Sequence, residues 1–237
     1  MEKKQALYAG KAKSLYATDH EDRLIVEYRD DASAFNGQKL AKLAGKGAVN
    51  NAINATIMDY LASHGIPTHF IEKISDTESV VKPLKMIPIE CVIRNVASGS
   101  LTRRLGIENG TVLPEPIFEN FLKDDALGDP MVNFSHITTL KYATAEQLEK
   151  MTALTFKVNQ LLSAWFATHD LLLVDFKLEF GEDKDGNMVL GDEISPDGCR
   201  IWDQQNNNNI LDKDRFRQDM GDVIENYHLI AQRIGAL

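Results

Sequence analysis

The sequence of 237 residues predicts an α+β fold of antiparallel sheets with flanking helices. Residues 174–180 alternate between apolar and charged side chains, which is typical of a half-buried strand. Apolar side chains at helical spacing recur over 148–165 and 216–230, as in amphipathic helices. Several short strand patterns precede them in the first 35 residues. Strands and helices therefore come in separate runs rather than in regular alternation, which favours the α+β class.

The first predicted lobe spans residues 1–86. Strands are expected at 7–8, 14–17 and 24–28, where Gly10 and an acidic cluster at 19–22 provide the turns. A helix is expected from Gly47 to His64 because apolar residues repeat every four positions and a Gly–Ile–Pro stop follows. Strands at 69–74 and 78–81 complete a mostly antiparallel unit with one helix.

The second predicted lobe spans residues 87–237. Pro83 and Pro88 bracket a segment that we expect to cross between the lobes, because proline cannot donate to a ladder. A strand at 90–96 leads into a helix at 101–105, and residues 110–130, with three prolines, are expected to be loop. Thr144 and Gln147 match a capping box that opens the next helix. A hairpin at 174–193, a polar loop at 204–209 and one final helix at 213–234 follow.

Composition excludes several classes of function. A net charge of −9 argues against non-specific binding to nucleic acid or anionic membranes. The N-terminus has no apolar signal segment, and no apolar run is long enough to span a bilayer. Cys91 and Cys199 are the only cysteines, which favours reduced thiols in the cytoplasm, with a single disulfide as the alternative. The six histidines lack zinc-like spacing.

The hairpin at 174–193 is a candidate metal site. A two-residue turn at Asp185-Gly186 would place Glu179 directly opposite Asp192, with Cβ atoms about 5 Å apart. Two carboxylates that close repel each other unless a cation lies between them, and Mg²⁺ is held by one or two carboxylates plus substrate phosphates. Asp175 and Lys177 share this face of the strand. A turn with an odd number of residues would break this register, and an ordinary charged hairpin is the alternative.

Two further clusters could bind phosphate. Gly10, Lys11, Ala12 and Lys13 occupy a strand–turn–strand, where glycine permits close approach and both lysines point the same way. A solvated lysine hairpin is the alternative, and no P-loop or Rossmann glycine motif occurs. The segment from Arg94 to Ser100 ends a strand and opens a helix. The free N–H groups at the start of that helix, together with the Arg94 side chain, could bind an anion. A capped helix beside a surface arginine would look the same.

Three charged segments carry less information by themselves. Residues 195–198 form a predicted tight turn that delivers Arg200. Residues 123–129 form a charged loop, for which solvation is the simplest explanation. The basic start of the last helix, residues 212–217, opposes the helix dipole, so these side chains could face an anion.

Taken together, these segments resemble the SAICAR synthase family of purine biosynthesis. The matching stretches run in family order over almost the whole chain: YAGKAKSLY, DDASAFNG, GKGAVNN, GIPTHF, SDTESVVKPLKMIPIECVIRNVASGSL, LPEPI, KDDALGDP, LVDFKLEFG, GDEISPDGCRIWD and LDKDRFRQDMG. Each stretch is short, but the ordered set is specific. Asn36 departs from the aspartate found in some members, so it receives no acid–base role.

The resemblance implies a two-lobed, ATP-grasp- or kinase-like fold with ATP in the cleft between the lobes. It implies a ligase that uses ATP and Mg²⁺ to join L-aspartate to carboxyaminoimidazole ribonucleotide (CAIR), through an acyl phosphate. It also implies a homo-oligomer, with a dimer favoured.

The same resemblance assigns roles to individual residues. Nucleotide binding falls to Gly10, Lys11, Ala12, Lys13, Val81, Lys82, Leu84, Met86 and Lys123, and metal binding to Glu179 and Asp192. Arg94, Ser100 and Arg200 would hold the CAIR phosphate, with Asp175 and Lys177 at its reacting end. Asp129, Ser195, Asp197, Lys213 and Arg215 would line the cleft.

Two alternatives remain at this point. A different ATP-dependent carboxylate–amine ligase or a kinase-like phosphotransferase would use the same hairpin and lysine turn, but would not need an anion site at Arg94 and Arg200. A non-catalytic nucleotide-binding protein would tolerate loss of the carboxylates or of Lys177, and all are present.

Overall fold

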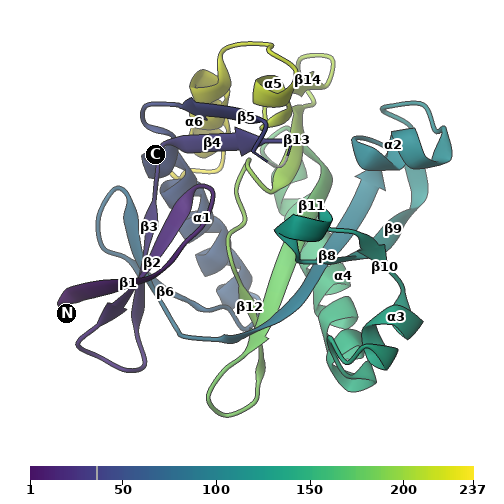
Figure 1. The fold of residues 1–237 in the computed structure, drawn as a ribbon. Coiled ribbons are helices and arrows are strands. Elements are labelled where there is room, and N and C mark those ends of the chain that lie inside the picture. The colour runs from purple at the N-terminus through teal and green to yellow at the C-terminus, as the bar shows by residue number, and fades with distance from the viewer. Residues whose placement is uncertain (36) are drawn as a thin grey trace.

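The computed structural model describes residues 1–35 and 37–237 as two antiparallel sheets with helices around them (Figure 1). Asn36 lies outside the described residues. The first sheet has the strand order β1-β2-β3-β7-β6. Its strands are β1 (Lys3–Ala9), β2 (Lys13–Thr18), β3 (Leu24–Tyr28), β6 (Phe70–Lys73) and β7 (Glu78–Val81). Helix α1 (Lys46–Ser63) packs against it, so the strands and the helix predicted for the first lobe are confirmed.

The second sheet contains the centre of the molecule. Its order is β10-β9-β8-β11-β13-β14, and β12 pairs with β11 off this path. The strands are β8 (Lys85–Val96), β9 (Val112–Leu122), β10 (Met131–Val132), β11 (Leu171–Glu182), β12 (Met188–Gly191), β13 (Cys199–Asp203) and β14 (Asn209–Ile210). Helix α4 (Ala145–Ala167) packs on β8 and β11.

The remaining elements surround these sheets. A separate hairpin, β4 (Asp31–Ala34) with β5 (Lys39–Lys42), lies beside the C-terminal helices in Figure 1, and Lys39 donates to the Phe216 carbonyl at 2.7 Å. The shorter helices are α2 (Ser100–Leu105), the 3-10 turn η1 (Asp125–Leu127), α3 (Phe134–Thr139), α5 (Asp214–Arg217) and α6 (Val223–Arg233). No helix of the described residues is long and apolar enough to cross a membrane.

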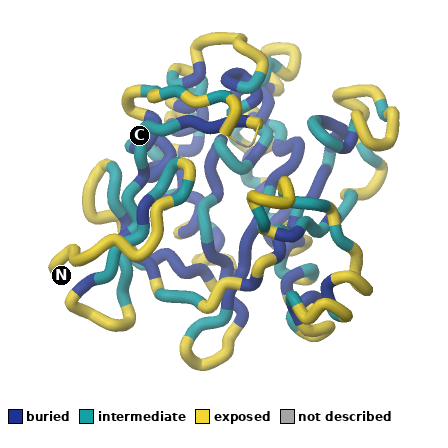
Figure 2. Tube along the Cα trace, viewed as in Figure 1, coloured by how far each residue is buried: buried dark blue, intermediate teal, exposed yellow. Residues whose placement is uncertain are grey.

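One hydrophobic core joins both lobes. β11 is buried along most of its length and β8 mainly at alternate positions (Figure 2), and the largest core cluster includes Ile53 of α1, Ile89 of β8, Leu162 of α4 and Phe180 of β11. Because the core is continuous, the sheets hold a fixed geometry across the cleft between them. The division at residue 86 stays a prediction.

The predicted register of the metal hairpin is wrong. Glu182 pairs with Met188, so five residues (183–187) form the turn, and Glu179 lies opposite Gly191 rather than Asp192. The Asp183 carboxylate accepts the backbone N–H groups of Asp185 and Asn187, at 2.9 Å each, and these bonds stabilise the longer turn. Register depends on loop length, and here the local hydrogen bonds of an aspartate favour the five-residue form.

Three other expectations need correction. Residues 112–122 form β9 rather than loop, although Pro114 and Pro116 lie in it. These prolines fall between Ile117, which pairs with Arg94, and Val112, which pairs with Val96, where the ladder is irregular and tolerates missing donors. The ladder of β8 also begins at Lys85, before Pro88, so the crossing between the sheets is shorter than predicted.

The final predicted helix is two helices. α5 ends at Arg217, and α6 begins only after Gly221 and Asp222, which both have left-handed backbone angles (φ of 73° and 50°). Met220, part of the apolar pattern over 216–230 that predicted one amphipathic helix, lies in this interruption and is 40% exposed. The capping box at Thr144 and Gln147, by contrast, is confirmed.

Candidate active site

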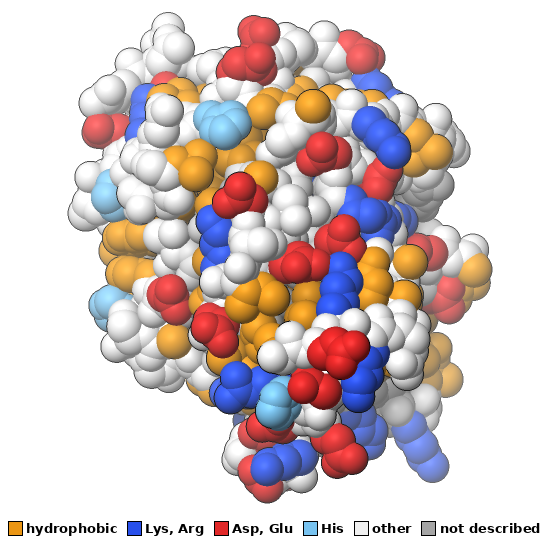
Figure 3. All heavy atoms as spheres, turned by 90° about the vertical axis from the view of Figure 1, so that its left-hand side faces the viewer, with side chains coloured by type: hydrophobic (Ala, Val, Ile, Leu, Met, Phe, Trp, Pro, Cys, Tyr) orange, Lys and Arg blue, Asp and Glu red, His pale blue; other side chains and the backbone are white. Residues whose placement is uncertain are grey.

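A cavity of about 410 Å³ lies between the two sheets. The β1–β2 turn, the segment after β7, the segment after β9 and the paired strands β8 and β11 line it. All nine residues predicted to bind nucleotide lie along this cavity: Gly10, Lys11, Ala12, Lys13, Val81, Lys82, Leu84, Met86 and Lys123. Figure 3 shows the side of the molecule that carries the first sheet, where positive and negative side chains are interspersed.

The β1–β2 turn presents its backbone and its lysines to the cavity. The Gly10 N–H donates to the Lys13 carbonyl at 2.8 Å, and Arg29 donates to the Gly10 carbonyl at 2.6 Å. A Cβ at Gly10 would lie 3.1 Å from the Tyr8 ring, so a side chain there would crowd the turn. The arrangement fits a loop that lies over phosphates.

Lysines bridge the two predicted metal carboxylates despite the altered register. Lys177 Nζ lies 2.5 Å from a Glu179 carboxylate oxygen and 2.8 Å from Asp192. Lys123 also contacts Glu179, and Lys13 also contacts Asp192. Asp192 has a left-handed backbone (φ 53°), because the chain leaves the ladder there and turns this side chain toward the cavity.

The electrostatics of this cluster follow from burial and charge. Burial lowers the pKa of Lys177, but Asp192 and Glu179 outweigh it and hold that pKa well above the usual value. Burial raises the pKa of Asp192, while Lys13 and Lys177 hold it well below the usual value. Both groups are therefore charged at neutral pH.

The donor set fits magnesium better than a transition metal. Among residues 1–35 and 37–237, no group of three or more His, Cys, Asp and Glu side chains is placed to hold a metal. Magnesium needs only one or two carboxylates when substrate phosphates supply the other oxygens. Glu179 and Asp192 meet that need, and the adjacent Glu193 has one buried carboxylate oxygen without a hydrogen bond in the described part of the chain.

A second cavity of about 240 Å³ adjoins the first. Glu90, Val92 and Arg94 line it at alternate positions of β8, with Asp175 and Lys177 from β11. Residues 90 and 94 are about 13 Å apart along a strand, so the cavity is long enough for a phosphorylated nucleoside. The two cavities share four lining residues: Glu90, Lys177, Asp197 and Gly198.

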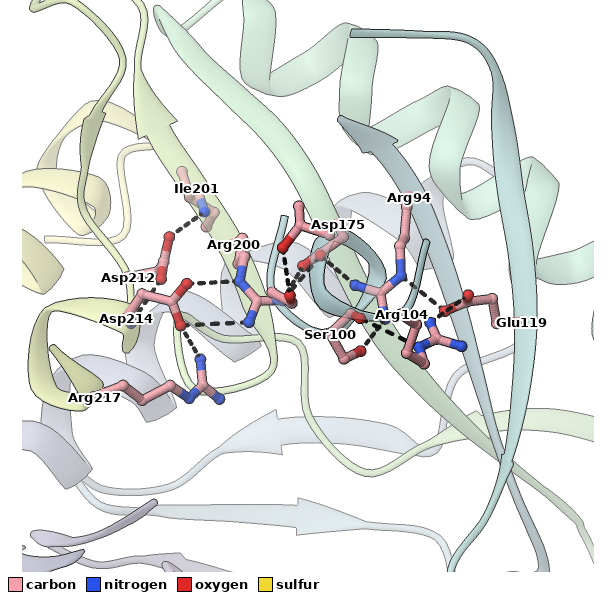
Figure 4. Close-up of polar contacts among 12 residues, drawn as sticks. Arg94, Ser100, Arg104, Glu119, Asp175, Arg200, Ile201, Asp212, Asp214 and Arg217 are labelled. Atoms are coloured by element: carbon pink, nitrogen blue, oxygen red, sulfur yellow. Dashed lines mark hydrogen bonds and ion pairs between the residues drawn. The ribbon is translucent and has the colours of Figure 1, made fainter. Parts of the chain in front are cut away.

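Arginines and carboxylates alternate at the far end of this second cavity (Figure 4). Arg94 donates to Asp175 and to Glu119 at 2.8 Å each, and to the Ser100 hydroxyl at 3.1 Å. Arg200 donates to Asp175 at 2.9 Å and to Asp214 at 2.7 Å. The structure thus brings together Arg94, Ser100 and Arg200, which are separated by up to 106 positions in the chain (200 − 94).

Glycine shapes the same end of the cavity. Gly99, just before α2, has φ of 59°, and a Cβ there would lie 2.4 Å from the Arg200 guanidinium. A side chain would therefore push Arg200 away and strain the backbone. The predicted anion site needs this glycine as well as its arginines.

The remaining predicted cleft residues differ in position. Asp129, Asp197 and Lys213 line the first cavity. Ser195 is fully buried, and its carbonyl accepts the N–H groups of Gly198 and Cys199, so it shapes the turn. Arg215 lines neither cavity and donates to the carbonyls of Gly221 and Ile210 at 2.8 and 3.0 Å.

Sequence reasoning missed Glu90, and it included Arg217 only as part of the basic segment 212–217, without a role of its own. Glu90 shares the parity of Arg94 along β8, so alternation on that strand could have identified it. Arg217 lines the second cavity, where it donates to Asp214 at 2.6 Å. The side chain of Arg217 reaches the cavity from the last residue of α5, and the prediction of one long helix over 213–234 did not include this helix end.

Comparisons with known proteins agree with this geometry. Residues 6–234 match the family model described as SAICAR synthetase. A phosphoribosylaminoimidazole-succinocarboxamide synthase from Cellvibrio japonicus is 56% identical over 235 residues, covering 99% of each chain. The crystal structure of this synthase from Ehrlichia chaffeensis has 43% identity and a TM-score of 0.96, covering 98% of this chain and 99% of the other. A SAICAR synthetase solved in complex with ADP has 46% identity and a TM-score of 0.93, covering 97% of each chain.

Proposed function

Because the chain belongs to the SAICAR synthetase family, we propose that its first cavity binds ATP and its second cavity binds CAIR. The enzyme is an ATP-dependent ligase of purine biosynthesis that joins CAIR and L-aspartate to give SAICAR, ADP and phosphate. The observation that carries the placement of substrates is that the two cavities meet at Lys177 and Glu90.

The ends of the second cavity orient CAIR. Its phosphate lies among Arg94, Arg200 and Arg217, whose guanidinium groups suit phosphate oxygens. Its carboxylate then reaches the end near Lys177, where the first cavity begins. The arginines also hold the carboxylates of Asp175 and Asp214 in place, through ion pairs of 2.9 and 2.7 Å from Arg200, so the anion site is well ordered.

The reaction needs two displacements at this junction. A CAIR carboxylate oxygen attacks the γ-phosphorus of ATP, and ADP leaves. The ammonium group of L-aspartate then loses a proton, the resulting amine attacks the acyl carbon, phosphate leaves, and the nitrogen loses a second proton. Phosphoryl transfer asks the protein for positioning and for neutralisation of charge. Lys11, Lys13, Lys123 and Lys177 supply positive charge along this path.

We place Mg²⁺ at Glu179 and Asp192. When bound, the ion neutralises phosphate oxygens and orients the γ-phosphate. Lys177 lies between these carboxylates, so it would either share them with the ion or turn toward the CAIR carboxylate. Either position keeps a positive charge beside the transferred phosphoryl group.

An ADP-release assay with Mg-ATP, CAIR and L-aspartate, omitting one component at a time, tests this function. We expect sustained release to require ATP, CAIR, L-aspartate and Mg²⁺, and the product to have the mass of SAICAR. Turnover that ignores CAIR, or that proceeds equally without Mg²⁺, would contradict the proposed site.

The oligomeric state and the cellular location are proposed from the family resemblance and from the cysteines. We expect a homo-oligomer, with a dimer favoured, and sedimentation velocity would measure the oligomeric state. A cytoplasmic location agrees with Cys91 and Cys199, which are both free and buried. The disulfide considered from the sequence is not formed.

A further inference from the structure

The cavity lysines differ in their partners. Lys11, Lys13, Lys123 and Lys177 each contact at least one carboxylate. Lys82 is exposed and only approaches the Thr68 carbonyl at 3.5 Å. The Lys213 ammonium, within the described residues 1–35 and 37–237, makes neither a hydrogen bond nor an ion pair, and Lys213 is half-buried in the wall of the first cavity. A half-buried cation without a partner that faces a cavity is suited to bind an anion there.

Asp197 attracts Lys213 but does not form an ion pair with it among the described residues. Its two oxygens instead contact Lys46 at 2.7 Å and the Tyr227 hydroxyl at 2.8 Å. Burial lowers the pKa of Lys213, and Asp197 opposes this without cancelling it. The Lys213 N–H donates to the Pro196 carbonyl at 3.1 Å, which fixes this residue beside the junction of the cavities.

Among the carboxylates of the two cavities, Glu90 is the one that lacks a close polar partner in the described part of the chain. Glu179 and Asp192 each contact two lysines, Asp175 contacts two arginines, and Asp125 contacts Lys11. Asp129 accepts the Asp124 N–H at 3.0 Å. Glu90 accepts no hydrogen bond among the described residues, and its nearest cation, Lys177 Nζ, is 3.5 Å away.

The junction therefore offers one cation and one carboxylate without close partners. ATP phosphates have Lys11, Lys13 and Lys123, and the CAIR phosphate has three arginines, so neither needs Lys213. The third substrate is a zwitterion with an additional carboxylate, and its nitrogen must reach the acyl carbon at this junction. We propose, on the basis of the function above, that Lys213 holds a carboxylate and Glu90 the ammonium group of the L-aspartate substrate.

Steady-state kinetics with Lys213→Gln and Glu90→Gln test this subsite. We expect each substitution to raise the KM for L-aspartate at least about tenfold, because each removes a charge-assisted contact, with the KM values for ATP and CAIR within about twofold. Lys184→Gln and Glu115→Gln are matched controls, since both side chains are exposed and lie outside the cavities, and they should leave all three constants unchanged.

Succinate separates the two contacts because it has both carboxylates but no ammonium group. Its inhibition against aspartate should weaken at least about tenfold in Lys213→Gln and stay unchanged in Glu90→Gln. Equal weakening in both variants, or an unchanged aspartate KM in Lys213→Gln, would overturn the subsite. A rise confined to the KM for ATP or CAIR would also overturn it.

The wild-type enzyme distinguishes this inference from the proposed function. Wild-type turnover with ATP, CAIR and L-aspartate tests the function itself, and its failure would count against both proposals. Normal wild-type turnover with unchanged aspartate kinetics in the two variants would reject the subsite alone.

Discussion

At the scale of single residues, the site depends on lysines that contact carboxylates across strands. Lys177 contacts Glu179 and Asp192, which are 13 positions apart in the chain (192 − 179). Glu179 lies in β11, and Asp192 directly follows the neighbouring strand β12. Each of these carboxylates also contacts a lysine from another part of the cavity. A change to one carboxylate therefore alters the positions of several charges at once.

Substitution of Glu179 by Gln, or of Asp192 by Asn, tests the metal assignment. Each keeps the side-chain volume but removes one of the two charges proposed for Mg²⁺, so we expect turnover to fall at least about 100-fold. ADP release measured over a range of Mg²⁺ concentrations gives the result, and the thermal unfolding curve shows whether the protein is folded. Asp185→Asn, in the exposed turn, is the control. Near-normal activity in either cavity variant would remove that residue from the metal site.

Arg94 should be replaced by lysine rather than alanine. It is 4% exposed and contacts both Glu119 and Asp175, so truncation would remove one of the two arginine partners of each of these buried carboxylates. Lysine keeps the charge but loses the planar group that binds phosphate with two hydrogen bonds.

We expect Arg94→Lys to raise the KM for CAIR about tenfold while the KM for ATP stays the same. Initial rates at varied CAIR and fixed saturating ATP measure it. Arg103→Gln serves as a control, because Arg103 lies exposed on the neighbouring α2. An unchanged CAIR constant in Arg94→Lys would mean that Arg94 supports the sheet without contacting the phosphate.

At the scale of elements, side-chain alternation was a good guide and local turn chemistry was not. The alternation at Asp175, Lys177 and Glu179 correctly predicted the strand and put these three on one face. The partner of Glu179 depended on the Asp183 carboxylate, which binds two backbone N–H groups and lengthens the turn. Pro114 and Pro116 led to the prediction of a loop in place of β9. These prolines are tolerated in the strand because the ladder is irregular where they lie. The first error arises from hydrogen bonds within the turn and the second from pairing between segments, and side-chain alternation along one strand reports neither.

The capping box of α4 gives an element-scale prediction. The Thr144 hydroxyl accepts the Gln147 N–H at 3.1 Å, and the Gln147 side chain accepts the Thr144 N–H at 2.8 Å. Thr144→Ala removes the first of these bonds, so the free energy of unfolding should fall by about 1 kcal/mol. Urea unfolding followed by circular dichroism measures this. Thr144→Ser keeps the hydroxyl and should lose much less, and an equal loss in both variants would argue against the cap.

At the scale of the whole molecule, buried polar contacts link elements that are far apart in the chain. Lys46, at the start of α1, is 1% exposed and contacts Asp197, which precedes β13. Tyr227 of α6 donates to the same carboxylate at 2.8 Å. One carboxylate thus connects the helix of the first lobe, the turn between the two cavities and the last helix. Sequence reasoning placed Asp197 in the cleft but missed both partners, because neither α1 nor α6 showed a periodic reason for a buried polar group.

This contact should make stability depend on pH in a defined direction. Burial raises the pKa of Asp197, but Lys213 and Lys46 outweigh burial and hold it below the usual value. A carboxyl whose folded pKa is depressed contributes stability above its unfolded pKa of about 3.9, and loses that contribution as the pH falls below it. The wild-type protein should therefore lose stability as the pH drops from 5 toward 3, in part through Asp197.

Lys46→Met should change both the stability and its pH dependence. It leaves Asp197 buried with one cation fewer, so the free energy of unfolding at neutral pH should fall by about 3–5 kcal/mol. The pKa of Asp197 should rise, so acidification from pH 5 to 3 should cost the variant less than the wild type. Because part of the loss comes from the uncompensated carboxylate, Lys46→Met combined with Asp197→Leu should be more stable than Lys46→Met itself. Urea unfolding of the four proteins of this cycle, at pH 7, 5 and 3, measures the coupling and its pH dependence. If the two losses simply add and the pH dependence does not change, Lys46 and Asp197 stabilise their own elements separately and do not join the two lobes.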